Sequence, residues 1–233
     1  MKYAFLPHPI PSLPIAGSDQ RFPVRRIFCV GRNYAEHARE MGASDQAAGL
    51  EPPFFFMKPG DALVSGSGEL SIAYPPITKN LHHEVEMVVA LGAGGVNVAA
   101  EAAHKLIFGY AVGLDLTRRD IQGKAKEKGH PWDMGKGFDQ SAVAGEIRPA
   151  ALAGHPGQGR IWLSVNGELR QDGDLSDMMW KVADIIANLS TSVRLEAGDL
   201  IYTGTPAGVG PIVPGDRLEA GVDGVGTLRA RIV

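Results

Sequence analysis

The stretch at residues 81–91, LHHEVEMVVAL, decides how the rest of the chain is interpreted. From Glu84 onward its frequent β-branched residues predict a strand, in which side chains two positions apart share a face. One face is wholly apolar, whereas the other begins with Glu84 and Glu86 and continues with Val88 and Ala90. Two neighbouring carboxylates on a partly dry face repel each other, and each is costly to bury alone. The stretch therefore predicts a shared proton or a bound cation, and we interpret the two glutamates as ligands of a divalent metal.

The composition excludes several classes of protein. Of the 233 residues, 44% are hydrophobic and 21% charged, and the net charge of -3 provides no basic field for nucleic acid or anionic lipid. No run of 18 apolar residues is available to span a membrane, and the first residues lack the apolar core of a secretory signal. The single cysteine, Cys29, makes no internal disulfide, which fits a reducing cytoplasm. We therefore expect a cytoplasmic protein with no nucleic-acid or membrane partner.

The order of expected elements predicts an α+β fold, mainly β, with one catalytic domain. Residues 1–23 contain five prolines and form an extended lead-in that cannot be helical, whereas residues 24–233 show no repeat and no linker. The Asn166-Gly167 pair predicts a two-residue hairpin turn. Strands are expected at 26–30, 54–59, 84–91, 107–115, 161–165, 168–171, 200–202 and 228–233, with a short hairpin around 69–72; helices at 33–42, 98–106, 117–128 and 177–190; and surface loops at 43–53 and 150–159.

Two of the expected helices begin with a residue that can cap them. Asn33 is the expected N-cap of the first helix, with Glu36 three residues later completing a capping-box-like pair and Gly42 ending the helix. Thr117, followed three residues later by Asp120, is the expected cap of the helix that runs to residue 128.

His37 and Glu40 lie three residues apart on the first helix and share a face. The pair has two interpretations. In one, it is an incidental contact on an exposed surface helix. In the other, Glu40 orients the His37 imidazole, which acts as a general base on a mobile segment. The residues alone leave both interpretations open.

A second informative strand, 107–115, ends in Asp115. One face is bulky, whereas the face that ends at Asp115 consists mostly of small residues, and glycines inside a strand often mark close approach by a ligand or another backbone. With Glu84 and Glu86, Asp115 completes three oxygen ligands that suit Mg²⁺ or Mn²⁺ and would also accept Ca²⁺. Zinc is disfavoured because no Cys or His pair has ligand spacing.

Cationic and polar side chains near these carboxylates indicate an anionic substrate. Lys58 ends one strand, Lys136 lies in a glycine-flanked segment, and Arg119 lies near a helix start, where anions are favoured. Gln122 shares a face with Arg119, and Thr205 lies on a glycine-rich loop where its hydroxyl can donate to a carboxylate. A metal with open positions beside a His–Glu base points to hydrolysis or enolate chemistry.

Six motifs occur in a characteristic order: Val30-Gly31-Arg32-Asn33-Tyr34, Phe56-Met57-Lys58-Pro59, His82-His83-Glu84-Val85-Glu86, Gly113-Leu114-Asp115-Leu116-Thr117-Arg118-Arg119-Asp120, Gly135-Lys136 and Thr203-Gly204-Thr205-Pro206. Together they resemble the catalytic domain of the fumarylacetoacetate hydrolase family over about residues 24–233. The resemblance implies a mixed β-sandwich roll, usually a homodimer, and an Mg²⁺ or Mn²⁺ site at Glu84, Glu86 and Asp115.

The resemblance also implies a role for each remaining candidate. His37 with Glu40 would be the water-activating pair on a lid helix, and Lys136 the residue for oxyanion stabilisation and proton transfer. The substrate-binding residues would be Arg119, Gln122 and Thr205, with Lys58 as a further cation for the anionic substrate.

Within the family the chain resembles most the bacterial members that act on fumarylpyruvate in gentisate catabolism. This implies hydrolysis of the carbon–carbon bond of an acylpyruvate, a small anionic keto acid, with fumarylpyruvate giving fumarate and pyruvate. The alternatives in the same family are an acylpyruvase, an oxaloacetate decarboxylase and a 2-hydroxymuconate-type isomerase, and only hydrolysis strictly needs the water-activating pair. A metal-stabilised protein without catalysis is the alternative of another class.

Overall fold

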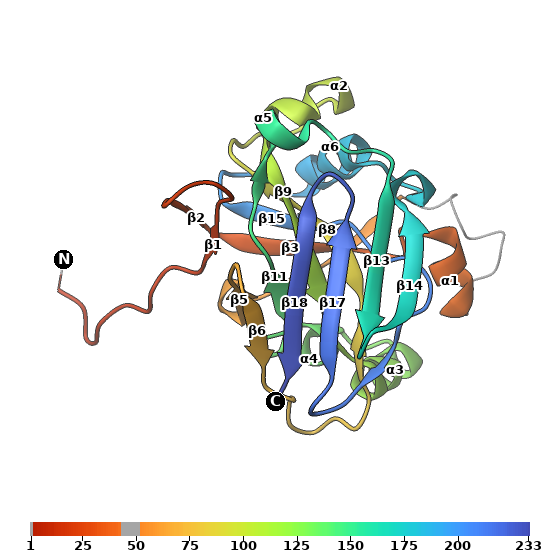
Figure 1. Cartoon of the computed structure of the whole chain (residues 1–233). Helices are drawn as coiled ribbons and strands as arrows, with labels where there is room; N and C mark the ends of the chain where they lie inside the picture. Colours follow the sequence, from red (N-terminus) through yellow and green to blue (C-terminus); the bar gives the residue numbers. More distant parts are fainter. Residues whose placement is uncertain (1, 43–51) are drawn as a thin grey trace.

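The computed structural model describes residues 2–42 and 52–233, so most of the loop expected at 43–53 lies outside the described residues. Two mixed β-sheets face each other, with α2, α5 and α6 at one end and α3 and α4 at the other (Figure 1). The helices are α1 (Ala35–Glu40), α2 (Ala100–Ala103), α3 (Arg119–Lys128), α4 (Asp133–Lys136), α5 (Ala150–Ala153) and α6 (Val182–Ser192), with 3₁₀ turns at Gly60–Ala62, His104–Leu106 and Leu175–Asp177. Each described helix is too short or too polar to reach across a bilayer.

The larger sheet has the order β4-β3-β15-β8-β9-β11-β5, with β12 beside β9, and the facing sheet has the order β14-β13-β17-β18-β6. The strands of the larger sheet are β3 (Arg26–Gly31), β4 (Phe54–Lys58), β5 (Leu63–Ser65), β8 (Val85–Leu91), β9 (Ile107–Asp115), β11 (Ala142–Ala144), β12 (Arg148–Pro149) and β15 (Asp199–Tyr202). Those of the facing sheet are β6 (Glu69–Ile72), β13 (Arg160–Val165), β14 (Glu168–Asp174), β17 (Arg217–Val222) and β18 (Gly226–Ile232). Smaller sheets join β1 (Ser12–Pro14) to β2 (Arg21–Pro23), and β10 (Thr117–Arg118) to β7 (Leu81–His83) and β16 (Gly210–Ile212).

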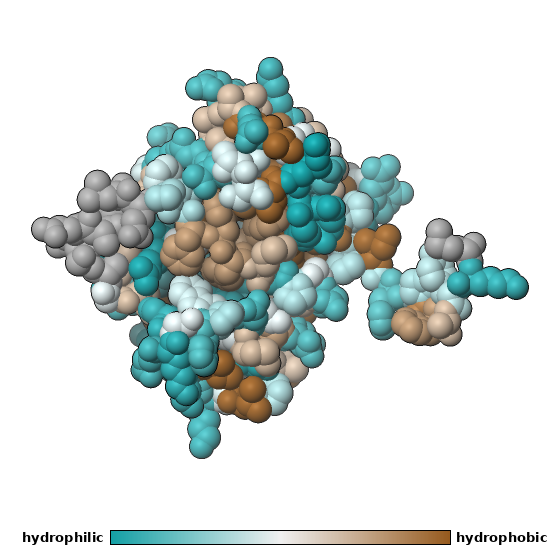
Figure 2. Space-filling view, turned by 180° about the vertical axis from the view of Figure 1, so that it is seen from behind, coloured by the Kyte–Doolittle hydropathy of each residue, from teal (hydrophilic) through white to brown (hydrophobic). Residues whose placement is uncertain are grey.

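The central strands of the larger sheet, β8, β9 and β15, are buried on both faces. Val85, Met87 and Val89 of β8 pack toward the facing sheet, in the same cluster as the inward residues of β13, β17 and β18. Val88 and Ala90 face the other way, into a second cluster that includes residues of the β1–β2 pair. The alternation expected for 84–91 is therefore confirmed, and it places Glu84 and Glu86 on the side away from the facing sheet. Viewed from behind, apolar surface occupies the middle of the molecule and is ringed by hydrophilic side chains (Figure 2).

Strand β9 departs from the expected alternation at one position. Its bulky residues Tyr110, Val112 and Leu114 share the inner cluster, as expected. Phe108 instead faces outward, and its ring centroid lies 5.2 Å from that of Phe22. A register shift beside Ala90 inserts Phe108 as an extra residue, and such a bulge reverses the side-chain direction beyond it.

Asn33 does not cap α1, so that prediction was wrong. The N-cap is Tyr34, and it makes no side-chain cap. The Asn33 amide instead donates to the carbonyl oxygens of Trp180 and Thr203 at 2.9 and 2.8 Å, and its oxygen accepts from the Trp180 N–H at 2.7 Å. Asn33 is fully buried. Burial explains the difference, because a buried amide must satisfy its hydrogen bonds, and here two distant segments, at Trp180 and Thr203, provide them.

The predicted cap at Thr117 was also wrong. Helix α3 begins after Arg118, without a side-chain cap. The Thr117 hydroxyl instead donates to Glu84 Oε1 at 3.1 Å. A buried carboxylate competes for this hydroxyl more strongly than a backbone N–H does, because hydrogen bonds to ionised groups are the stronger ones.

Three predicted elements were wrong in extent, pairing or type. The surface loop expected at 150–159 begins with the helix α5. The hairpin expected around 69–72 is absent, because β6 pairs in parallel with β18, and β5 pairs with β11 in the other sheet. Helix α6 begins at Val182, not at residue 177, because residues 178–180 are held against Asn33 and Tyr34 by backbone pairing. The expected hairpin of β13 and β14 is confirmed, with Asn166 and Gly167 both at positive φ as a type I′ turn requires.

Candidate active site

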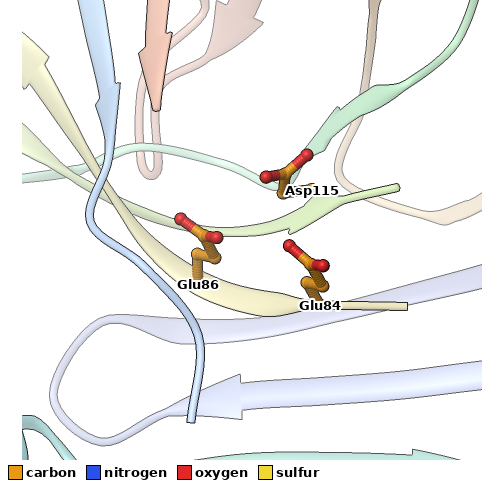
Figure 3. Close-up of side chains that lie close together, drawn as sticks. All are labelled: Glu84, Glu86 and Asp115. Atoms are coloured by element: carbon orange, nitrogen blue, oxygen red, sulfur yellow. The ribbon is translucent and has the colours of Figure 1, made fainter. Parts of the chain in front are cut away.

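Three carboxylates converge where β8 and β9 lie side by side. Glu84 precedes β8, Glu86 lies within it, and Asp115 is the last residue of β9. The antiparallel register places Asp115 beside Glu84, whose carbonyl accepts the Asp115 N–H at 2.9 Å. Each residue offers an oxygen within 4.8 Å of the others, and all three side chains are buried (Figure 3). The two strands therefore bring together the ligand set expected from the sequence.

Buried cations contact two of these carboxylates. Lys136 Nζ donates to Glu84 Oε2 and to Asp115 Oδ2, both at 2.7 Å, and Arg119 pairs with the other oxygen of Glu84. Lys58 Nζ lies 2.8 Å from Asp115 Oδ1. Burial raises the pKa of Glu84, but Lys136 and Arg119 outweigh it and leave the pKa well below its ordinary value. Glu84 is therefore a carboxylate at neutral pH.

Glu86 is the exception, because no described cation contacts it. Its Oε2 accepts the Gly204 N–H at 2.7 Å. Gly204 has a φ of +97°, and a Cβ there would lie 2.7 Å from the Cβ of Asn33, so only glycine fits this approach. Burial, together with the charges of Asp115 and Glu84, raises the pKa of Glu86 well above its ordinary value.

The residues present fit a divalent metal. Asp115 Oδ1 meets Lys58 only at ion-pair distance and makes no hydrogen bond, although it is buried. The second oxygen of Glu86 accepts no described hydrogen bond, and Glu86 lines the pocket. A buried carboxylate oxygen without a donor is costly, and a hard cation relieves that cost. Three oxygen ligands are the donor set that Mg²⁺, Mn²⁺ and Ca²⁺ share.

Helix α1 presents His37 to the same site. The side chain is buried, and Nδ1 lies 3.2 Å from Glu40 Oε2. Burial lowers the pKa of His37, although the charge of Glu84 and the hydrogen bond to Glu40 oppose the shift. Glu40 also accepts the Gly208 N–H at 3.3 Å, which ties α1 to the glycine-rich loop. The interpretation of an incidental surface pair does not fit a buried imidazole.

One pocket joins these groups. The predicted residues that line it are His37, Glu84, Glu86, Asp115, Arg119, Gln122, Lys136 and Thr205. Arg119 also donates to Gln122 Oε1 at 2.7 Å, so the two share a face as expected. Lys58 and Glu40 are not among the lining residues, because each lies behind the residue that it contacts.

Comparison with known proteins identifies the family. The family model described as fumarylacetoacetate (FAA) hydrolase C-terminal matches residues 26–233. The chain belongs to this family.

Relatives within the fumarylacetoacetate hydrolase family match nearly the whole chain. The crystal structure of fumarylpyruvate hydrolase from Pseudomonas aeruginosa in complex with Mn²⁺ and pyruvate is 49% identical, with a TM-score of 0.96 over 100% of this chain and 99% of that one. A fumarylpyruvate hydrolase of Ralstonia is 45% identical over 77% of this chain and 92% of that protein. A mitochondrial oxaloacetate tautomerase of mouse is 44% identical over 89% of this chain and 91% of that protein. The expected mixed β-sandwich roll is therefore confirmed.

Gln171 of β14 is a buried residue near the site that the sequence did not predict. Its Oε1 accepts from His83 Nδ1 at 2.9 Å and from the Val85 N–H at 3.0 Å. Its Nε2 donates to Thr205 Oγ1 at 2.8 Å and to the Pro206 carbonyl at 2.9 Å. The amide thus fixes the start of β8 against the loop that carries Thr205. No local pattern marks it, because all four partners are distant in sequence.

The pocket has a wall that the sequence reasoning also missed. Phe54, Phe56 and Trp132 line it, together with the cations Arg32 and Lys126. The alternation of β4 offered a signal, because Phe54, Phe56 and Lys58 share one face of that strand.

Proposed function

We propose that the protein is a divalent-metal-dependent hydrolase that cleaves the carbon–carbon bond of an acylpyruvate, with fumarylpyruvate as substrate and fumarate and pyruvate as products. The observation that carries this proposal is that the His37 imidazole, oriented by Glu40, lines the same pocket as the carboxylate triad. The similarity to fumarylpyruvate hydrolases, one of them solved with Mn²⁺ and pyruvate, supports it.

The charge of the inner pocket supports an anionic substrate. With Glu86 ionised, as a metal ligand must be, the three carboxylates of the triad balance the charges of Lys58, Lys136 and Arg119, which contact Glu84 and Asp115. A divalent cation would leave two positive charges in excess. A substrate with two carboxylates would compensate that excess inside the pocket, where an uncompensated charge is costly. Fumarylpyruvate is such a dianion.

Glu84, Glu86 and Asp115 would hold Mg²⁺ or Mn²⁺ in this mechanism. The bound cation would supply Lewis-acid stabilisation of negative charge on the pyruvyl oxygens of the substrate. Arg119 and Gln122 are joined at one wall of the pocket and would bind the substrate carboxylate beside it. The Thr205 hydroxyl accepts from Gln171, so its own proton is free to donate to the substrate.

His37 would take a proton from the attacking water, while Glu40 accepts the hydrogen bond from Nδ1 and stabilises the imidazolium that forms. The water oxygen bonds to the distal acyl carbonyl carbon, and the bond from that carbon to the pyruvyl methylene breaks. The electron pair passes into the pyruvate enolate, which is protonated at carbon to give pyruvate. The acyl group leaves as its acid.

Lys136 would stabilise the oxyanion as a hydrogen-bond donor, and the His37 imidazolium would return the proton to the enolate carbon. Burial lowers the pKa of Lys136, but Asp115 and Glu84 outweigh it and raise the pKa above its ordinary value. The ammonium therefore stays charged at neutral pH, which suits a hydrogen-bond donor to an oxyanion and excludes a general base. Lys58 contacts Asp115 and two backbone carbonyls but not the pocket, so it would position Asp115 and act on the substrate only through it.

A second candidate function is keto–enol interconversion of oxaloacetate, which needs enolate stabilisation but no attacking water. The similarity to oxaloacetate tautomerases of mouse and Escherichia coli favours it. Mn²⁺-loaded protein should be assayed in parallel with fumarylpyruvate, acetylpyruvate and oxaloacetate, following both the enol absorbance and the release of pyruvate. Hydrolysis releases pyruvate from the first two substrates, whereas a tautomerase changes only the oxaloacetate enol signal.

The substitution His37→Ala tests the proposed base. We expect hydrolysis of fumarylpyruvate to fall about 10²- to 10⁴-fold, the range for removing a general base. Mn²⁺ affinity should not change, because His37 is not among the proposed metal ligands. Exchange of the exposed Glu168 for Gln is the matched control. Full retention of hydrolysis in His37→Ala would remove the assignment.

Chelation separates the enzyme from a metal-stabilised protein without catalysis. EDTA should abolish hydrolysis, and Mg²⁺ or Mn²⁺ should restore it. A fall in melting temperature with no activity under any metal would favour the non-catalytic alternative.

The proposal also includes assembly and location. We expect a homodimer that acts in the cytoplasm in gentisate breakdown, as the family resemblance implies. Size-exclusion chromatography coupled to light scattering measures the molar mass of the protein in solution and tests whether it is a dimer.

A further inference from the structure

The outer part of the pocket contains two cations that have no acidic partner among the described residues. Arg32 and Lys126 line the pocket, and within residues 2–42 and 52–233 neither forms an ion pair. Both are half-buried. Burial lowers the pKa of Lys126, and the nearby charges of Arg32 and Arg119 lower it further. Like charges crowded in this way gain from an anion that binds between them.

An aromatic strip separates these cations from the carboxylate triad. It begins at Lys136, whose Nζ lies 5.0 Å from the centroid of the Phe56 ring. The Phe56 and Trp132 centroids are 5.9 Å apart, and Trp132 and Phe54 are 5.4 Å apart, edge to face. The Arg32 guanidinium lies 5.8 Å from the Phe54 centroid. Arg32 is therefore at the far end of the strip from the triad.

Strand β4 sets the length of this strip. Phe54, Phe56 and Lys58 alternate on one face, and Lys58 contacts Asp115. The four residue steps from Phe54 to Lys58 in an extended strand span about 13 Å. This length leaves room for a conjugated acyl chain along the rings. Phe54 is held close by Gly31, where any Cβ would meet its ring at 2.1 Å.

The backbone conformation of Arg32 is a further observation. Its φ is +57°, a left-handed conformation that costs a residue other than glycine about 1 kcal/mol and that is enriched at functional sites. The Arg32 guanidinium lies against the aromatic strip, and no described carboxylate pairs with it.

We propose that Arg32 and Lys126 form a second anion subsite, which binds the carboxylate at the far end of the acyl group and selects acylpyruvates that carry one. The inference rests on the proposed function for the identity of that substrate. Its physical content is a pocket with two anion-binding ends: the triad end for the 2-oxo acid and the Arg32 end for a distal carboxylate.

A matched pair of ligands that the enzyme cannot cleave tests the subsite by binding alone. 2-Oxoheptanedioate has the chain length of fumarylpyruvate and both carboxylates, whereas 2-oxoheptanoate lacks only the distal one. Titration calorimetry with Mn²⁺-loaded protein should show about tenfold tighter binding of the diacid, as expected for a partly exposed charge-assisted hydrogen bond. Arg32→Met and Lys126→Met should each remove most of that preference and leave 2-oxoheptanoate within about twofold.

Lys128→Met, an exposed lysine on the same helix and outside the pocket, is the control and should change neither affinity. Unchanged binding of 2-oxoheptanoate shows that each variant is folded. Equal binding of the two ligands by the unsubstituted protein would overturn the subsite, as would variants that weaken both ligands alike. If the protein prefers the diacid but cleaves no acylpyruvate, the subsite stands and the proposed function fails. If it cleaves fumarylpyruvate but binds the two ligands equally well, the proposed function stands and the subsite fails.

Discussion

The two ends of the pocket handle charge in opposite ways. At the inner end, Glu84 and Asp115 are buried and share the ammonium of Lys136 at 2.7 Å. At the outer end, Arg32 and Lys126 are half-buried and have no acidic partner among the described residues. The charges of the inner end are therefore paired before a ligand binds. The cations of the outer end gain a partner only when an anionic ligand binds. The comparison predicts that substitutions at the inner end cost stability, and that those at the outer end cost selectivity.

The largest expected effect is that of Lys136→Met. Methionine keeps the buried stem but removes the ammonium, which leaves Glu84 and Asp115 without their shared cation. Leaving a buried charge unpaired costs about 3–5 kcal/mol, and because Arg119 and Lys58 still contact these carboxylates, we expect a loss near the lower end of that range in the free energy of unfolding without metal. Mn²⁺ should restore part of it by supplying another cation. Urea unfolding with and without Mn²⁺ measures both.

Arg160→Met is the matched control, because Arg160 pairs with Asp172 at 2.6 Å on the exposed face of the other sheet. Exposed pairs contribute little, so its stability should barely change. Arg32→Met should behave in the same way, since no described carboxylate loses a partner. A large loss in Arg32→Met, or none in Lys136→Met, would contradict the comparison between the two ends.

An intermediate effect is expected from Gln171→Leu. Leucine fills similar space but cannot hold the Thr205 hydroxyl, so kcat/KM for fumarylpyruvate should fall about tenfold, the equivalent of one lost buried hydrogen bond. Thr205→Val should cost a similar amount. If Gln171 acts through Thr205, the double variant will be no worse than Thr205→Val alone. Additive losses would indicate a purely structural role for Gln171.

The smallest effect concerns pH. Burial lowers the pKa of His37 below 6.5, so the neutral base persists above that pH, and the acid limb of kcat/KM should lie below it. The unfolded chain then binds the proton more readily, and the stability from His37 is complete above pH 6.5 and is lost as the pH falls through the folded pKa. The Glu40 hydrogen bond opposes the shift, so Glu40→Gln should move the limb to lower pH. An upward shift in a pH–rate profile would contradict this.

Local pattern was enough to predict the candidate metal site. Alternation in β8 assigned Glu84 and Glu86 to one face, and alternation in β9 assigned Asp115 to its small face. The same periodicity predicted the core residues of both strands, because side-chain direction in a strand depends only on the spacing of residues. The periodicity assigned Phe108 to the wrong face, because a bulge arises from the pairing of two strands and not from the spacing within one strand.

Contacts between distant segments were beyond the sequence. Asn33 and Thr117 carry the signature of helix caps, yet each donates to partners far along the chain. Gln171 carried no signal, and Arg32 lay in a family motif without an assigned role, because their surroundings exist only after β14, β4 and the 203–209 loop are packed. A hydrogen bond within one turn competes with every other partner that folding brings close, and a buried polar group takes the set that satisfies it fully. The sequence by itself therefore determined which faces carry charge, whereas the tertiary structure alone decided which of those charges meet.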